Sequence, residues 1–305
     1  MNNQNVLGLL SMLLASIFFS LMNACIKILS SHLSITQCML FRSILMCLFV
    51  ALLFLFKPLQ KTHAKGGYFL LFIRAFCGTS SMLLFFYNIS TIPLGTASTF
   101  AQSLPLYAVI FAFFFLKETL SIIVIFATCL GFLGIILISN PSSNISLVNA
   151  IIGILSGITA AIALVSLRGC REYFEERVII LSFGILASLM SLFGILLHSF
   201  FTFDFLAWQS IPHSMWIYIF AMGLTGTLGQ FFVTKAFVLA PAGIVAPLDY
   251  SKIVFSLFLG LALGDPLPNT LTTLGIILVI TSGLLIAFPV AFKDFKYPTI
   301  RRRIK

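Results

Sequence analysis

The chain has 305 residues, of which 60% are hydrophobic and only 9% are charged, and its formal net charge is +10. A soluble domain is typically about 45–50% apolar and about 25% charged, so this composition excludes a soluble globular protein. The basic excess alone would suit a nucleic-acid partner, but its distribution along the chain points to membrane topology, and no nucleic acid is expected.

Ten apolar stretches are long enough to cross a membrane, because a spanning helix needs roughly 20 mostly apolar residues. A transmembrane barrel would show alternating segments of roughly ten residues instead of long apolar runs. We therefore expect an all-α membrane protein with ten transmembrane helices. The predicted helices cover residues 6–30, 35–56, 68–91, 95–116, 119–139, 148–167, 178–200, 214–239, 243–263 and 270–291.

The Lys and Arg residues outside these stretches all fall on one side if the amino terminus lies in the cytoplasm. The opposite loops contain none, and cytoplasmic loops are those that carry an excess of Lys and Arg. We therefore expect both termini in the cytoplasm, in a bacterial inner membrane, with anionic lipids near the basic tail. The residues on the cytoplasmic side are Lys57, Lys61, Lys65, Lys117, Arg168, Arg171, Arg177, Lys293, Lys296, Arg301, Arg302, Arg303 and Lys305.

Few ionisable residues lie inside the predicted helices, where they are costly and by default mark functional sites. Asp249 and Lys252 stand three positions apart, so they either neutralise each other or face a substrate from one side of the ninth helix. Glu118 and Asp265 each begin a predicted helix, where an acid meets the helix dipole, and are expected to be structural. Lys27 and Lys235 lie near helix ends, from which they can reach the membrane surface instead. Arg42 and Arg74 can bind backbone carbonyls or lipid phosphate.

The six cysteines and four histidines are scattered along the chain without the spacing of metal ligands, so no metal site is expected. The cysteines lie mostly inside helices, where a free thiol behaves as a small hydrophobic group. No nucleophile, acid and base converge in the sequence. We therefore expect neither a cofactor nor an enzyme.

The sequence repeats itself once, and its polar positions coincide as well as its apolar ones. A shift of 147 residues places Asn88 on Lys235 and Gln102 on Asp249. Each half then holds five helices, and because five is odd, the second half enters the membrane from the opposite side. Inverted repeats are typical of secondary carriers, which bind substrate near the midplane between the repeats. The predicted segments are a first repeat at 1–140, a second repeat at 148–291 and a basic tail at 292–305.

The inverted topology places Asn88 and Gln102 towards the outer face, and Lys235 and Asp249 towards the inner face. Two separate polar clusters would then flank a central volume, like the two gates of an alternating-access carrier. The candidate residues for binding a small-molecule substrate are Asp249, Lys252, Tyr250, Arg74, Lys235, Gln102, Asn88 and Tyr87.

A set of residues spread over both halves matches a known pattern: Lys27, Arg42, Pro93, Pro105, Leu116-x-Glu118, Ala236, Pro241, Pro247, Tyr250 and Asp265. In this set the chain resembles, over nearly its whole length, the EamA-type permeases of the drug/metabolite transporter superfamily. Asp265 stands where that family often has Glu, and the second half has no clear partner for Arg42. The resemblance implies a ten-helix carrier with its site between the halves.

A narrower likeness lies in Lys235-Ala-Phe…Ala242-x-x-Val245-Ala-Pro-x-x-Tyr250, which is similar to the S-adenosylmethionine uptake carriers of intracellular bacteria. This implies uptake of that compound, or its exchange with S-adenosylhomocysteine. Asp249 would then meet a cationic group of the substrate, Lys252 or Arg74 its carboxylate, and Tyr87 or Tyr250 its base or sulfonium. Asp249 could instead bind and release a proton to couple transport.

Two other functions suit the same sequence. The first is export of amino acids or drugs, because the family contains carriers of both directions. The second is a lipid flippase, in which the basic residues would bind a phosphate head group. In each case we expect membrane lipids as neighbours of the chain.

Overall fold

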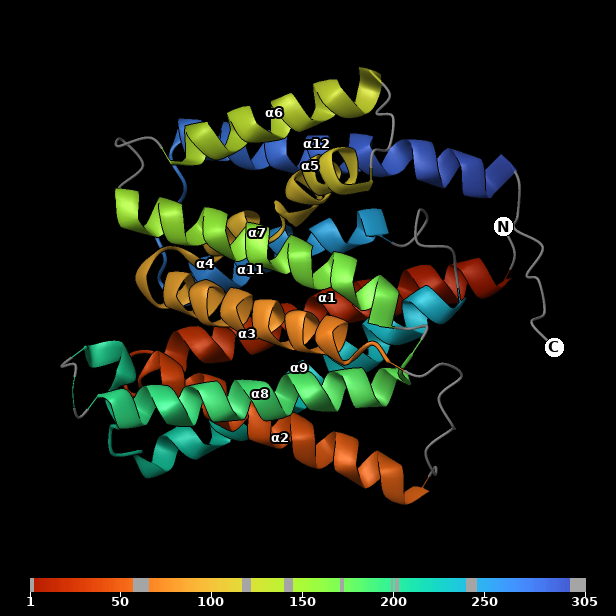
Figure 1. Cartoon of the computed structure of the whole chain (residues 1–305). Coiled ribbons are helices and arrows are strands. Elements are labelled where there is room, and N and C mark those ends of the chain that lie inside the picture. The colour runs from red at the N-terminus through yellow and green to blue at the C-terminus, as the bar shows by residue number, and fades with distance from the viewer. Residues whose placement is uncertain are drawn as a thin grey trace.

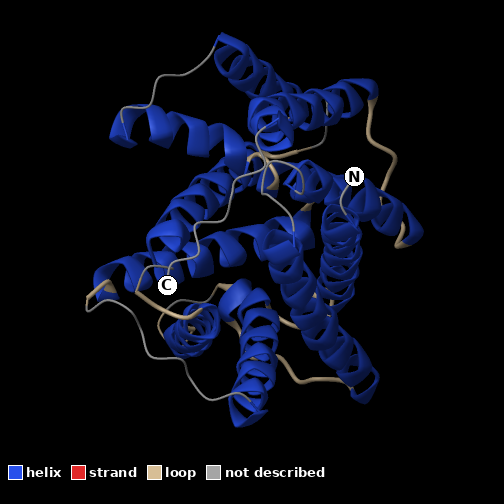
Figure 2. Cartoon of the chain, turned by 90° about the vertical axis from the view of Figure 1, so that its right-hand side faces the viewer, coloured by secondary structure: helices blue, strands red, loops and turns tan. Residues whose placement is uncertain are grey.

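The structure, a computed structural model, describes residues 3–56, 66–116, 122–139, 145–170, 173–198, 200, 203–239 and 246–296. Every regular element among these residues is a helix (Figure 2). Helices are expected here because a backbone in lipid must satisfy its own hydrogen bonds. The helices, with 3-10 turns written η, are α1 Asn3–Leu29, α2 Ile35–Phe56, α3 Tyr68–Thr91, α4 Leu94–Ala101, α5 Leu104–Leu116, α6 Ile122–Ile138, α7 Leu147–Cys170, α8 Glu176–Leu197, η2 Asp204–Leu206, η3 His213–Met215, α9 Trp216–Leu239, η4 Ala246–Tyr250, α11 Ser251–Ala262 and α12 Thr270–Lys296.

The lengths of these helices fit a membrane. Within the described residues, six helices are long and apolar enough to span one, and α6 and α12 contain shorter apolar runs. Helices α2 and α3 coincide with the predicted stretches 35–56 and 68–91. The prediction of an all-α membrane protein is therefore confirmed. The fourth span consists of α4 and α5, and η4 and α11 form the described part of the ninth.

The fourth span is broken near its middle, so the prediction of one helix over 95–116 is wrong in that detail. Helix α4 ends at Ala101 and α5 begins at Leu104. The cause is Pro105, which has no N–H and whose ring clashes with the carbonyl four residues earlier, that of Ala101. In the ninth span, η4 gives way to α11 at Ser251, 147 residues after Leu104. The repeat found in the sequence thus reappears in the positions of these helix starts.

The helices of the two halves pack in symmetric pairs, as inverted repeats require. Helix α1 lies along α9 and α3 lies along α7, so the first span of each half contacts the third span of the other. Helix α2 packs against α8, and α6 against α12, each beside its own counterpart. Helices α6 and α12 lie together at one side of the bundle, and α2, α8 and α9 at the opposite side (Figure 1). A helix touches its counterpart only near the symmetry axis, so the axis passes between these pairs.

The two ends of the bundle are distinguished by the ends of the chain. Helix α1 begins and α12 ends at the right of Figure 1, which we call the terminal end. Helix α3 ends and α4 begins at the opposite, distal end (Figure 1). In this frame α7 ends and α8 begins at the terminal end, because each span reverses the direction of the one before it.

Gly134 of α6 and Gly275 of α12 bring these helices together backbone to backbone. A Cβ atom on Gly275 would lie 2.6 Å from the carbonyl oxygen of Gly134, and a Cβ on Gly134 would lie 2.7 Å from the carbonyl oxygen of Gly275. A backbone carbonyl cannot swing away as a flexible side chain can. Small residues matter here because lipid is as apolar as a side chain, so close packing holds membrane helices together.

We expect the substitution Gly275→Ala to destabilise the fold by about 1–3 kcal/mol, the usual penalty of overpacking. Gly194→Ala is the matched control, because its added Cβ would lie 3.3 Å from the side chains of Leu206 and Thr36, which can adjust. The melting temperature of each purified variant in detergent measures the difference. Equal melting temperatures would contradict the backbone contact between α6 and α12.

Candidate functional site

A cavity of about 340 Å³ lies between the two halves of the chain. Sites for small molecules typically measure about 300–1,000 Å³, so this one suits a small metabolite. Its walls come from α1, α2, α3, α4 and α5 of the first half and from α7, α8, α9 and α11 of the second. The cavity extends towards the terminal end, because α7 contributes Leu167 from its last turn and α8 contributes Ile179 from its first.

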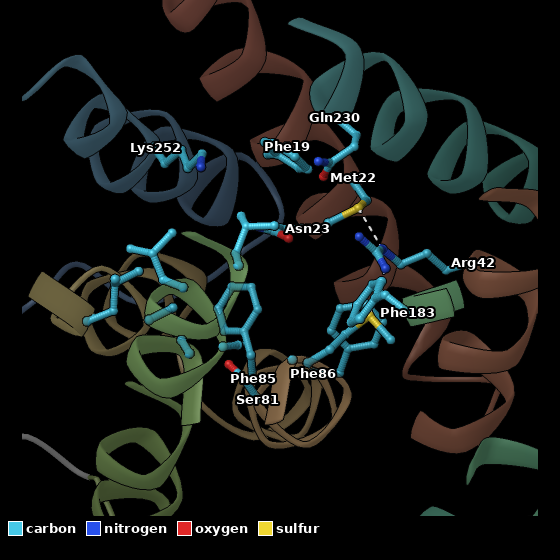
Figure 3. A pocket seen from close by; sticks show the side chains of 18 of the residues that line it. Phe19, Met22, Asn23, Arg42, Ser81, Phe85, Phe86, Phe183, Gln230 and Lys252 are labelled. Atoms are coloured by element: carbon cyan, nitrogen blue, oxygen red, sulfur yellow. Dashed lines mark hydrogen bonds between the residues drawn. The ribbon is translucent and has the colours of Figure 1, made fainter. Parts of the chain in front are cut away.

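The guanidinium of Arg42 lies buried in the cavity wall, and its side chain is 8% exposed. Its Nε lies 3.3 Å from the sulfur of Met22, its Nη1 lies 2.7 Å from the sulfur of Met82, and its carbon Cζ lies 6.0 Å from the centre of the Phe86 ring. Thioether sulfurs are weak acceptors, so these contacts leave the charge largely uncompensated. Figure 3 shows Arg42 and Lys252 at opposite sides of the cavity.

Arg74 of α3 places a second guanidinium in the same wall. Its Cζ lies 5.5 Å from the centre of the Phe183 ring, and its buried Nε has no hydrogen-bond partner. Gly78, one turn further along α3, makes room for this side chain, since a Cβ there would collide with Nη1 of Arg74. Within the described part of the chain, neither Arg42 nor Arg74 forms an ion pair.

Two buried polar groups at the cavity also have no partner. Asn23 is 4% exposed and its Oδ1 receives no hydrogen bond, and Ser98 is 2% exposed with an unpaired hydroxyl. Both residues line the cavity, and the amide oxygen of Asn23 points into it (Figure 3). Because buried polar groups are almost always hydrogen-bonded, these two are positioned to be satisfied by a bound molecule.

Gln102 and Asp249, which the 147-residue shift superposes, contact each other directly. Nε2 of Gln102 donates to the carbonyl oxygen of Asp249 at 2.9 Å and to its Oδ2 at 3.2 Å. Nζ of Lys252 lies 2.5 Å from Oδ1 of Asp249 and 4.6 Å from the centre of the Phe19 ring. Residues related by the repeat meet only at its axis, so the broken fourth and ninth spans touch there. The expectation that Gln102 and Asp249 belong to separate clusters is therefore wrong.

The cavity has an excess of positive charge. Arg42, Arg74 and Lys252 line it, and Asp249, held by Lys252 and Gln102, supplies the neighbouring negative charge. Charges in a membrane interior normally pair with one another. Two guanidinium groups without carboxylate partners therefore give the cavity a charge that favours an anionic ligand.

The pair of Asp249 and Lys252 can be tested by removing its members singly and together. Asp249→Asn leaves the Lys252 ammonium without its partner, and we expect a loss of about 1–3 kcal/mol in stability. The double substitution Asp249→Asn/Lys252→Met removes both charges and should regain most of that stability. Melting temperature and transport are measured together, and we expect the double variant to keep less than about a tenth of the transport. Recovery of both would show that the pair is purely structural.

The structure places the eight sequence-predicted candidates in different surroundings. Arg74, Gln102 and Lys252 line the cavity, and Asp249 holds two of them. The other four lie elsewhere: Tyr250 is buried against Gly283 of α12, Tyr87 packs edge-on against Phe205, Asn88 donates to the carbonyl of Asn149 on α7, and Lys235 is exposed on α9.

Sequence reasoning did not include several residues that form the cavity. Arg42 was recognised as an unusual intramembrane cation, but nothing in the sequence separated it from a lipid-facing arginine. Asn23 and Ser98 are neutral residues in helices with many polar positions, and no periodic signal marks them. The aromatic walls, Phe85 and Phe183, are two among 34 phenylalanines. The charge of Arg42 within an apolar run marked it as a candidate, but did not show that it faces the cavity.

Polar contacts join the two halves at the distal end, in a group that we call the distal ion-pair cluster and define as Lys27, Ile92, Leu94 and Asp265. Nζ of Lys27 lies 3.1 Å from Oδ1 of Asp265 and donates to the carbonyl of Ile92 at 2.7 Å. The N–H of Leu94, at the start of α4, donates to Oδ2 of Asp265 at 2.7 Å. The cluster ties α1 and the α3–α4 turn of one half to the second half.

Asp265 does not begin the tenth helix as predicted, because α12 starts only at Thr270. The residue follows α11 in a Schellman motif, in which its own N–H donates to the carbonyl of Gly260 and Gly264 adopts φ 93°. The carboxylate does meet a helix amino terminus, but that of α4 in the other half. Lys27 likewise forms an ion pair instead of extending to the membrane surface. Glu118 lies outside the described residues.

The inverted helical pairs, the broken spans at their axis and the cavity between the halves define a polytopic membrane transporter. Comparison with known proteins agrees, since the sequence profile of the EamA-like transporter family matches residues 6–140. The chain belongs to the EamA-like transporter family. This family and the similar proteins below are transporters, not enzymes.

Three relatives illustrate the range of similar proteins. An uncharacterized transporter of Helicobacter pylori J99 is 40% identical over 302 residues, covering 97% of this chain and 99% of the relative. A pseudopaline exporter of Pseudomonas aeruginosa is 30% identical over 285 residues, covering 92% of this chain and 95% of the relative. An S-adenosylmethionine uptake transporter of Rickettsia conorii is 25% identical over 215 residues, covering 68% and 69%.

Proposed function

We propose that the chain carries a small metabolite with a carboxylate or phosphate group through this cavity by alternating access. The observation that carries the proposal is Arg42, whose buried guanidinium contacts two thioether sulfurs and a ring instead of an acid. An anionic substrate would supply the missing partner, because the planar fork of donors matches carboxylate and phosphate oxygens. The methionine and phenylalanine side chains of the wall would contact its apolar part.

The conformation of the structure suits one state of an alternating-access cycle, in which the cavity opens towards one end only. The cavity extends towards the terminal end, and the distal ion-pair cluster closes the other end. We propose that the terminal end faces the cytoplasm, because the helices that precede the basic stretches of the sequence, α2, α7 and α12, all end there (Figure 1). The repeats 1–140 and 148–291 would then rock against each other around the bound substrate. The breaks at Gln102 and at η4 are the natural points of bending.

S-adenosylmethionine and S-adenosylhomocysteine are candidate substrates on the resemblance to the uptake carriers. Each offers a carboxylate to Arg42 and an aromatic base to the phenylalanine faces of the wall. The sulfonium fits less well, because the cavity already holds three cations and the carboxylate of Asp249 is paired with Lys252. We therefore expect S-adenosylhomocysteine, which lacks the sulfonium charge, to bind at least as tightly as S-adenosylmethionine. Amino acids share the carboxylate and are the second candidate class.

Counterflow into proteoliposomes tests the proposal, and it does not depend on the direction of transport in the cell. Vesicles are loaded with one unlabelled compound, and entry of its labelled form is followed. The panel contains both adenosyl compounds, glutamate, succinate and the diamine putrescine, which has no anionic group. We expect at least one carboxylate to accumulate and putrescine to stay outside. Accumulation of putrescine alone, or scrambling of labelled lipid without solute entry, would contradict the proposal.

A further inference from the structure

The guanidiniums of Arg42, from α2, and Arg74, from α3, contact α3 at different heights. Arg42 contacts Met82 through its Nη1, whereas the guanidinium of Arg74 folds over Gly78. Residues 78 and 82 of α3 are four positions apart, and at 1.5 Å per residue this corresponds to a separation of roughly 6 Å along the helix. The cavity thus offers two cationic positions about one helical turn apart.

Each guanidinium rests on its own aromatic ring. Phe86 lies beneath Arg42 at 6.0 Å, and Phe183 of α8 lies beneath Arg74 at 5.5 Å. A ring on one side of the planar group takes none of its N–H donors, so those that do not contact Met22 or Met82 remain available to a planar anion. The buried Nε–H of Arg74 donates no hydrogen bond, which is consistent with a donor kept for a ligand.

Asn23 calls for a hydrogen-bond donor on the ligand, whereas the two arginines call for anionic groups. The buried amide oxygen of Asn23 receives no hydrogen bond and points into the cavity that Arg42 also lines (Figure 3). A ligand with an anionic group on Arg42 would therefore also present an N–H or O–H group to Asn23. The α-carboxylate and α-ammonium of an amino acid have this arrangement.

We infer that the preferred substrate class is a doubly anionic amino-acid-like compound, with one anion on Arg42, a second on Arg74 and a hydrogen-bond donor on Asn23. This rests on the proposed function, which needs only the first anion. Arg74 is then the specificity-determining residue, because it separates compounds with two anionic groups from those with one. A second anion would also neutralise the remaining unpaired charge of the cavity.

Paired probes that differ in one anionic group test this inference in proteoliposomes of the full chain. The pairs are glutamate and glutamine, succinate and succinamate, and phosphoserine and serine. We expect the wild type to prefer the doubly anionic member of at least one pair by about tenfold or more in apparent affinity. Arg74→Gln should abolish that preference by weakening binding of the doubly anionic member, and Arg74→Lys should keep part of it.

The outcomes separate this inference from the proposed function. Lys235→Gln is the matched control, because it removes an exposed helix cation outside the cavity and should leave the preference intact. Two results would reject a second anionic group at Arg74 and leave the proposed function standing. One is that the wild type takes up the singly and doubly anionic members equally well, and the other is that the preference survives in Arg74→Gln. Failure of all six probes and of both adenosyl compounds, in vesicles that hold folded wild-type protein, would reject both.

Discussion

Replacing Arg42 with methionine is expected to abolish transport while leaving the protein at least as stable as the wild type. Loss of a buried charged partner weakens binding by about 2–5 kcal/mol, which is roughly 30-fold to several thousand-fold in Kd. Stability should hold because an apolar residue in place of a buried charge is often neutral or favourable. The new side chain would join Met22 and Met82, which already surround the site.

The two readouts of this variant must be measured on the same preparation. Counterflow reports transport, and the melting temperature in detergent reports the fold. Lys235→Met is the matched control, because it makes the same change of residue class on an exposed part of α9. Normal transport by Arg42→Met would remove Arg42 from the substrate site. A large fall in its melting temperature would instead assign the arginine a structural role.

Substituting Asp265 by Asn is expected to open the distal end. The variant keeps an acceptor for the N–H of Leu94 but loses the charge that faces Lys27. The side chains retain 20% and 12% exposure, so we expect a shift of about 1–2 kcal/mol, below the 3–5 kcal/mol of a fully buried pair. Such a shift changes the population of an open state by roughly 5- to 30-fold.

Cys38 provides a native reporter for that opening. It is 1% exposed on α2 and belongs to the same buried cluster as Ile92 and Leu94. In a chain where Cys38 is the only cysteine, its rate of reaction with a membrane-impermeant thiol reagent should rise in Asp265→Asn. Asp204→Asn, the same change at an exposed acid in η2, should leave the rate unchanged. Equal rates in both variants would show that the distal ion-pair cluster does not hold the bundle shut.

The sequence was sufficient for the membrane fold because the relevant forces act locally. The apolar runs at 35–56 and 68–91 became α2 and α3 without change, since helical hydrogen bonding in lipid is satisfied within one segment. The repeat was equally visible, because polar residues at equal spacing survive in both halves. The break after Ala101 could have been located from Pro105, whose ring acts on the carbonyl four residues earlier.

The site was predicted less well because it depends on distances between segments far apart in the chain. The shift placed Gln102 on Asp249, but only the structure shows that both lie near the axis and therefore touch. Asp265 was expected to begin the tenth helix, but its carboxylate instead meets the amino terminus of α4, at Leu94, 171 residues away in sequence. Arg42 looked like any other intramembrane cation until its neighbours were known to be methionine sulfurs.

The anion site at Arg42 is tested most directly by removing the charge of Arg42 and the charge of the substrate, singly and together. A carboxylate found by counterflow is compared with its methyl ester as competitors of labelled uptake, in the wild type and in Arg42→Met. We expect the wild type to favour the acid by roughly 30-fold or more, and the variant to bind acid and ester equally weakly. An ester that competes as well as the acid in the wild type would contradict an anion site at Arg42.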